Sequence, residues 1–181
     1  MAQTKLDFLQ LEGSDLADTL DRYMYKVDPP KIMFASSFDS TFHYQMPFKT
    51  AVSTLDSYLA NADAEKKFTM VFQFDKAMDR ESVESLFNWK IGRSTSSQPG
   101  QIYNYGLSVP DTEVQVNPLP DNVYYDLESF KATVTFTIQQ NATADGSIDP
   151  THIEFKFSGK DAFGNKMDPD FDQYMGFSGS V

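Results

Sequence analysis

Cysteine is absent from the 181-residue sequence, which also holds only two histidines and one tryptophan. The absence of cysteine excludes disulfide bonds, thiolate metal sites and cysteine nucleophiles. The two histidines, His43 and His152, lie far apart in the sequence, and neither belongs to a serine-hydrolase or metalloprotease motif. A zinc site would need carboxylates to complete its ligands. These absences predict a protein that is not an enzyme.

Basic residues are scarce, since 15 lysines and arginines stand against 26 aspartates and glutamates and give a formal net charge of −11 at pH 7. Phosphate backbones and anionic bilayers repel a surface of this sign, so nucleic acid is not an expected partner. No run of about 18 apolar residues is present, so membrane insertion is not expected. No apolar segment follows Lys5, which predicts no signal peptide in this sequence and leaves the compartment open.

Apolar residues are plentiful, at 40% of the chain with 16 phenylalanines and 9 tyrosines, enough for one hydrophobic core. Over residues 14–27 the apolar positions follow the three- and four-residue spacing of an amphipathic helix. A glycine precedes this segment, and Asp28-Pro29-Pro30 follows it. The sequence therefore predicts a helical appendage over residues 1–28 and one domain over residues 29–181.

The remainder of the chain consists mainly of short segments in which apolar and polar residues alternate, as in half-buried strands. The expected strands are 31–35, 41–45, 67–74, 87–91, 101–109, 112–117, 131–139 and 152–158. Residues 141–150 are expected to join the last two as a hairpin connection. A short helix is expected within residues 50–61, and Asp79 is expected to cap one or two helical turns. This pattern predicts a mainly β fold, an antiparallel sandwich.

The same alternation predicts the core of that sandwich. In segment 131–139 threonines alternate with apolar residues, and in segment 67–74 phenylalanine or methionine occupies every second position. The core positions expected from the pattern are Phe68, Met70, Phe72, Phe74, Met78, Val134, Phe136, Ile138, Phe155 and Phe157. We expect this aromatic core to carry the stability that disulfides cannot supply.

Two further segments resemble the motifs of a known domain family. Residues 72–83 read Phe-Gln-Phe-Asp-Lys-Ala-Met-Asp-Arg-Glu-Ser-Val, and residues 158–168 read Ser-Gly-Lys-Asp-Ala-Phe-Gly-Asn-Lys-Met-Asp. They are similar to a strand with its Met-Asp turn and to a closing Asp-x-x-Gly-Asn turn of the bacterial Ig-like domains found in S-layer and other multidomain surface proteins. The resemblance covers about residues 29–177. It implies an Ig-like β-sandwich that acts as a spacer, adhesion or assembly module.

Two oxygen-rich stretches are candidate calcium sites. The first, residues 141–149, has oxygen-bearing side chains at the spacing of the first nine positions of an EF-hand loop. At the twelfth position, where that loop has a bidentate acid, this chain has His152. Its candidate ligands are Asn141, Thr143, Asp145 and Asp149. The candidate ligands of the second stretch are Asp161, Asn165, Asp168, Asp170 and Asp172. Ca²⁺ is therefore a candidate cofactor, and solvated turns held by aspartate and asparagine side chains are the alternative at both places.

Tyr103 and Tyr105 form a candidate ligand-binding pair, because they would lie on one face of the expected strand 101–109. Aromatic faces of this kind can stack on sugars, although the same spacing fits two core residues. Paired carboxylates of a glycoside hydrolase are a further alternative, because their separation depends on the tertiary fold.

Together these features predict a non-catalytic structural or interaction module of a bacterial surface or secreted assembly. Its expected partners are other proteins or neighbouring domains of the same assembly, with a glycan as an alternative ligand. A carbohydrate-binding β-sandwich is the second candidate function, and a glycoside hydrolase-like enzyme is the third. The helix at 14–27 is expected either to pack on the sheet or to contact a partner.

Overall fold

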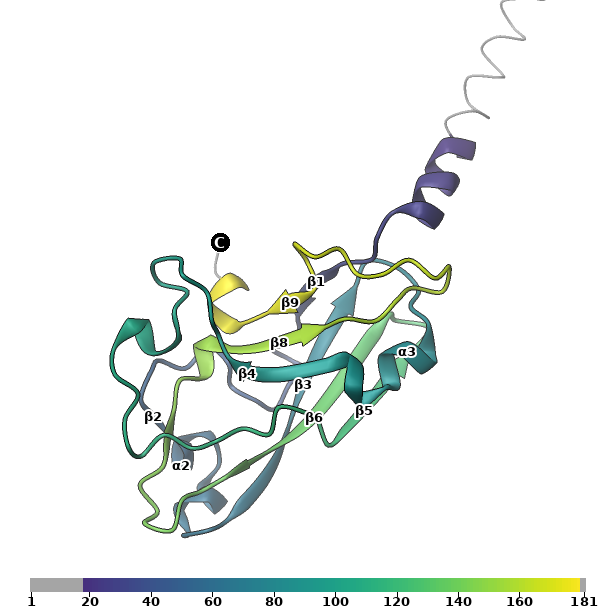
Figure 1. Ribbon diagram of the computed structural model, residues 1–181. Coiled ribbons are helices and arrows are strands. Elements are labelled where there is room, and N and C mark those ends of the chain that lie inside the picture. Colours follow the sequence, from purple (N-terminus) through teal and green to yellow (C-terminus); the bar gives the residue numbers. More distant parts are fainter. Residues whose placement is uncertain (1–17, 180–181) are drawn as a thin grey trace, which may run out of the picture.

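The computed structural model describes residues 18–179, in which two antiparallel sheets account for most of the ordered pairing (Figure 1). The larger sheet has the strand order β1 (Ile32–Ala35), β3 (Glu65–Phe74), β6 (Lys131–Gln139) and β5 (Asn122–Asp126). The smaller sheet has the order β4 (Trp89–Arg93), β8 (Ile153–Phe157) and β9 (Gln173–Tyr174). Two short strands, β2 (Thr50–Ala51) and β7 (Ser147–Ile148), pair with each other. The predicted mainly β, antiparallel fold is confirmed.

The helical segments between the strands, and the one that follows the last strand, are short. They are α2 (Val52–Leu55), η1 (Ser57–Ala60), α3 (Arg80–Glu84), η2 (Leu86–Asn88), η3 (Tyr103–Gly106), η4 (Pro150–His152) and η5 (Gly176–Gly179). The helix predicted within residues 50–61 is present as α2 and η1, and Asp79 caps α3 by accepting the backbone N–H of Ser82 at 2.7 Å. Among residues 18–179, no helix is both long and apolar enough to span a bilayer.

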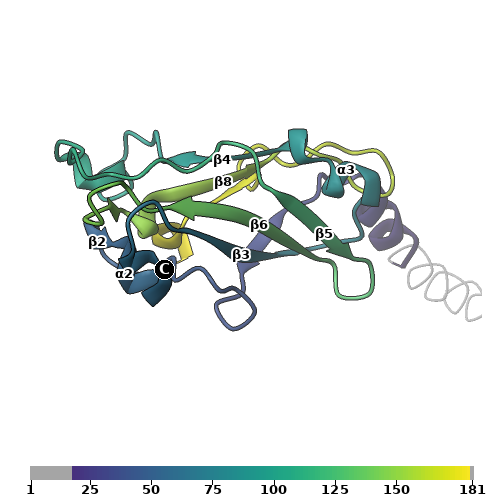
Figure 2. The ribbon, with the colours of Figure 1, turned by 90° about the horizontal axis from the view of Figure 1, so that it is seen from below.

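The two sheets lie in separate layers with an aromatic core between them (Figure 2). Phe72 of β3 packs against Trp89 of β4 at 5.5 Å and against Phe155 of β8 at 5.4 Å between ring centroids. All ten predicted core side chains are buried, which confirms the alternation in both layers. The Trp89 indole also donates a hydrogen bond to the Val83 carbonyl, so its polar atom is satisfied inside the core. We call these layers and their connections, residues 30–179, the β body.

The hairpin expected at 141–150 is wrong, because the strands it joins belong to different sheets. β6 pairs with β3 and β5, whereas β8 pairs with β4 and β9. Each strand turns its apolar residues toward the same core from opposite sides, so alternation alone could not separate hairpin partners from facing layers. The connection is a crossover between the layers.

Several strand predictions also need correction. Residues 41–45 form turns, although Phe42 and Tyr44 are buried as expected. Residues 112–117 make two isolated bridges along the side of the body, and β5 was not predicted. In β1 the pairing with β3 shifts between Ile32 and Phe34, so Phe34 turns outward and is half exposed.

Candidate functional site

Residues 18–27 form a helix that stands outside the β body and leads into β1 (Figure 1). Every residue of this segment is exposed, including its large apolar side chains. The exposed fractions are 58% for Leu20, 60% for Tyr23, 43% for Met24 and 41% for Val27. The predicted helix is thus confirmed over residues 18–27, and its first four positions lie outside the described residues. Clustered exposed apolar side chains are typical of surfaces that contact another molecule, so this helix is a candidate interaction surface.

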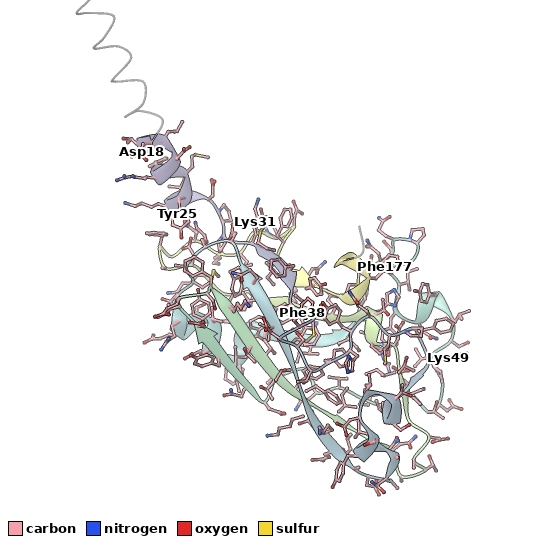
Figure 3. All side chains as sticks on the ribbon, turned by 180° about the vertical axis from the view of Figure 1, so that it is seen from behind. Asp18, Tyr25, Lys31, Phe38, Lys49 and Phe177 are labelled. Atoms are coloured by element: carbon pink, nitrogen blue, oxygen red, sulfur yellow. The ribbon has the colours of Figure 1, made fainter. Side chains whose placement is uncertain are left out.

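This N-terminal helix meets the β body at its C-terminal end and extends away from it (Figure 1). Tyr25 lies at the end next to the body and Asp18 at the far end (Figure 3). The Tyr25 hydroxyl accepts the backbone N–H of Ala77 at 3.3 Å, and its ring meets the edge of Phe163 at 5.9 Å. Because each residue advances a helix by about 100°, Tyr23 and Val27 lie nearly opposite Tyr25. The exposed apolar stripe, which consists of Leu20, Tyr23 and Val27, therefore differs from the side of the helix that Tyr25 anchors.

A buried lysine holds the end of this helix. The Lys76 ammonium lies 2.9 Å from Asp161 Oδ2 and donates a hydrogen bond of 2.7 Å to the Asp28 carbonyl oxygen, directly after the helix. It also lies 5.0 Å from the centroid of the Tyr25 ring. The side chains of Lys76 and Asp161 are only 3% and 0% exposed. A charge buried this deeply is stable only when it is fully paired, so the contact fixes where the helix leaves the body.

The turn after Asp161 completes this helix seat, which consists of Lys76, Asp161 and Asn165. Asp161 Oδ1 accepts the backbone N–H groups of Phe163 and Asn165 at 2.9 and 2.8 Å, and Oδ2 accepts the Asn165 side-chain amide. Gly164 supplies the positive φ of 91° that the turn requires. Burial acts to raise the pKa of Asp161, but hydrogen bonds from Asn165 and Lys76 outweigh it and lower the pKa. Asn165 also donates to the Lys26 carbonyl of the helix.

Three aspartates of the second calcium stretch therefore pair with three different lysines. Asp161 pairs with Lys76, Asp168 lies 3.7 Å from Lys31, and Asp172 lies 3.2 Å from Lys156. Asp168 also accepts the backbone N–H of Asp170. Within residues 18–179 no group of three or more His, Cys, Asp or Glu side chains is arranged to hold a metal ion. Calcium binding stays a prediction, and at Asp161 the cation in place is an ammonium group.

The first calcium stretch brings three of its four residues together. Asp145 accepts hydrogen bonds from the side chains of Thr143 and Asn141, which lower the pKa of its carboxyl group. Asp149 turns into the interior instead and is fully buried. Its carboxylate accepts the backbone N–H of Asn104 at 2.6 Å. The loop thus has the form of a turn held by its own side chains.

The strand expected at 101–109 is wrong, and with it the shared face of Tyr103 and Tyr105. These residues lie in η3, where Asn104 and Tyr105 have φ values of 52° and 54°. Tyr103 is buried and accepts the backbone N–H of Asp149, whereas Tyr105 is half exposed and packs against Phe48 at 5.3 Å. The buried Asp149 carboxylate holds the Asn104 N–H in this turn. The two tyrosines therefore do not form a stacking platform.

A buried histidine joins these segments instead. His152 Nδ1 lies 2.8 Å from Asp149 Oδ2, and Nε2 lies 2.6 Å from the Gly100 carbonyl oxygen. The ring packs edge-on against Tyr105 at 4.8 Å and stacks on Phe177 at 5.6 Å. Both ring nitrogens are occupied within the fold, so neither is left for a substrate proton. His152 therefore acts as a structural contact between the loop at 100–105, η4 and η5.

Glu113 is a partly buried acid beside this histidine contact. Burial raises its pKa to about 7, Arg93 opposes the shift, and the Asp149 carboxylate adds to it. One of its carboxyl oxygens, Oε1, is buried and makes no hydrogen bond to the described residues. Burial and the nearby Asp149 carboxylate therefore destabilise the ionised form of Glu113.

Sequence reasoning missed Lys76, although it lies inside the Phe-x-Phe-Asp-Lys-Ala-Met motif that was singled out. A lysine between two strand phenylalanines and a buried methionine was the available signal.

Comparison of the chain with protein-family models, curated proteins and solved structures gives no match. The assignment of the N-terminal helix and its seat therefore depends on geometry.

Proposed function

We propose that the chain is a non-catalytic interaction module of a bacterial surface or secreted assembly, in which the β body presents the N-terminal helix to a protein partner. One observation carries this proposal: an exposed apolar stripe stands on a helix whose C-terminal end is held by a buried ion pair. Leu20 and Tyr23 are more than half exposed, while Lys76 is almost fully buried. A helix laid by its apolar face into a partner is a common mode of protein recognition.

We further propose that the β body is an Ig-like sandwich. Named A to G in chain order, its strands are β1, β3, β4, β5, β6, β8 and β9, with β2 and β7 as an added pair. The two sheets then have the orders A-B-E-D and C-F-G. These are the sheets of a constant-type immunoglobulin domain, which supports the resemblance drawn from the sequence.

Core contacts support the same proposal. In antibody domains a tryptophan on strand C packs against a disulfide between strands B and F. Here Trp89 of strand C packs between Phe72 of strand B, at 5.5 Å, and Phe157 of strand F, at 4.6 Å. Aromatic rings thus occupy the place of the disulfide in a chain without cysteine. The two motifs that carry the resemblance also lie side by side, through the bridge between Met78 and Asp161.

Photo-crosslinking tests the proposed function. A benzophenone amino acid is placed at Tyr23, on the apolar stripe, and separately at Asp21, on another side of the same helix. Both variants are expressed in the organism that produces the chain. We expect irradiation to attach protein to position 23 and not to position 21. Equal or absent adducts at the two positions would refute a docking role for the stripe.

Cell fractionation of the same organism tests the proposed location. We expect the chain in the surface or culture-supernatant fraction, alongside its crosslinked partner. Recovery of the chain only with cytoplasmic marker enzymes would contradict the surface or secreted assembly. That result would leave the docking role of the helix to the crosslinking experiment.

A further inference from the structure

The outer face of the smaller sheet, which is turned away from the core, carries a groove of about 550 Å³ over β4 and β8 (Figure 1). Lys90 and Gly92 of β4, and Glu154 and Lys156 of β8, alternate with buried core residues of the same strands and therefore face outward. Gly92 keeps the floor open, because a Cβ there would meet no atom within 4 Å. The volume lies within the range of small-ligand sites, about 300 to 1,000 Å³.

Two lysines stand opposite each other on the floor of this groove. Lys90 and Lys156 are direct partners in the register of β4 and β8. Like charges at directly opposed positions destabilise a sheet. Asp172 lies 3.2 Å from the Lys156 ammonium, but Lys90 has no ion pair among residues 18–179. An anionic group bound at Lys90 would compensate this repulsion, so the pair has the charge pattern of an anion-binding position.

The next row of the floor has the opposite charge. Glu154 is the register partner of Gly92, two residues along the strands and so about 7 Å from the lysine row. Burial raises the pKa of Glu154, and the charges of Lys156 and Lys90 oppose this shift. Because a carboxylate stands this close to the lysines, the groove disfavours a densely charged polyanion. It suits a ligand that has one anionic group and, beside it, hydroxyl groups that can donate to Glu154.

An aromatic ring stands at the end of the groove. Phe87 precedes β4, lines the groove and is 84% exposed. An exposed aromatic face can pack on the apolar face of a sugar ring. A peptide fits less well, because the backbones of β4 and β8 are paired with each other from Trp89 to Arg93 and leave no free ladder for a further strand on this face.

We propose that this groove binds an acidic saccharide, with the sugar carboxylate at Lys90, its hydroxyl groups at Glu154 and a sugar ring on Phe87. Charge, spacing and the aromatic face all favour this class of ligand. The groove is separate from the docking surface proposed above, since none of residues 18–27 lines it. The β body would thus hold a glycan while the N-terminal helix contacts a protein.

Calorimetric titration of the full-length chain tests this site. The probes are short oligomers of galacturonic, glucuronic and mannuronic acid, and the methyl ester of the tightest binder is the uncharged control. We expect at least one acid oligomer to bind, its methyl ester to bind about tenfold or more weakly, and added salt to weaken binding. Failure of all the oligomers to bind at millimolar concentration, or equal binding of acid and ester, would overturn the proposal.

Variants of the floor locate the binding. Lys90→Gln should weaken binding about tenfold or more, and it should not lower the melting midpoint, because it removes a like-charge contact. Lys67→Gln is the matched control, since Lys67 is an exposed lysine of β3 outside the groove. Gly92→Leu fills the floor and should abolish binding.

Equal affinity of the Lys90→Gln and Lys67→Gln variants would overturn the assigned site. A peptide of alternating glutamate and glycine represents the other class of acidic ligand. If this peptide binds more tightly than every sugar acid, the groove takes an acidic protein segment and the saccharide proposal is wrong. Neither result bears on the docking role of the helix, which the crosslinking experiment tests separately.

Discussion

Replacing Lys76 by methionine would test how firmly the N-terminal helix is held. Methionine keeps most of the apolar stem but removes the ammonium, so Asp161 would remain in the interior without its counter-ion. Removal of one partner of a buried ion pair costs about 3 to 5 kcal/mol. Asp161 would keep three N–H donors from Phe163 and Asn165, so we expect the lower end, about 3 kcal/mol. For a chain of this size that loss lowers the melting midpoint by about 6 to 12 °C.

Urea unfolding followed by circular dichroism measures this loss. Lys160→Met is the matched control, because Lys160 pairs with Asp79 at 3.9 Å with half of its side chain exposed, and it should cost less than about 1 kcal/mol. Adding Asp161→Asn to Lys76→Met removes the unpaired charge, so the double variant should be more stable than the single one. If Lys76→Met costs no more than Lys160→Met, the ion pair does not hold the helix, and the account of the seat is wrong.

Three further predictions concern the β body. Burial raises the pKa of Glu113 from an ordinary value of 4.5 to about 7 in the folded chain. Between these two pH values the folded chain binds more protons than the unfolded chain, so the free energy of unfolding falls as the pH rises. At pH 8 Glu113→Gln should stabilise the chain by about 1 to 2 kcal/mol in urea titrations, because partial solvent access reduces the full effect of about 3 kcal/mol. A gain that persists at pH 4 would contradict this. Gly159→Ala places a Cβ 2.1 Å from the Phe157 ring, so we expect it to lower the free energy of unfolding by about 1 to 3 kcal/mol in thermal melts. Gly92→Ala is the control, because a Cβ at position 92 meets no atom within 4 Å. Lysines already pair with Asp161, Asp168 and Asp172, so we expect this second stretch to contribute no rise in the melting midpoint at millimolar calcium; a rise that persists in an Asp145→Asn variant would contradict this.

Local patterns predicted the elements whose burial is one-sided and regular. The alternation in β6 predicted its bounds at Lys131 and Gln139 correctly, because one face meets the core along its whole length. The strand β5 was missed because Tyr124, between two buried residues, is an exposed aromatic and hides the alternation. Periodicity therefore reports burial, and it fails where a large apolar side chain faces solvent.

Long-range contacts account for most of the remaining errors. The expected strand at 101–109 is a turn because Asn104 donates its backbone N–H to a carboxylate 45 residues later, at Asp149. Likewise the sequence gives no sign that Asp161 pairs with Lys76, which lies 85 residues earlier (161 − 76 = 85). Single-sequence patterns carry no information about which distant residue arrives at a site. For the same reason, the sequence leaves open whether the helix packs on the sheet or contacts a partner.

The first and last strands of the β body meet, since the Ile32 N–H donates to the Phe171 carbonyl at 2.9 Å. This contact closes a loop of 139 residues (171 − 32 = 139), and β9 follows two residues later. During synthesis β3 and β6 can pair once residue 139 has left the ribosome, but the smaller sheet lacks its third strand until residues 173 and 174 emerge. The N-terminal helix thus emerges long before its seat at Asp161 exists. Because Leu20, Tyr23 and Val27 stay exposed after the body has closed, closure fixes the place where the helix leaves the body and does not cover its apolar side chains.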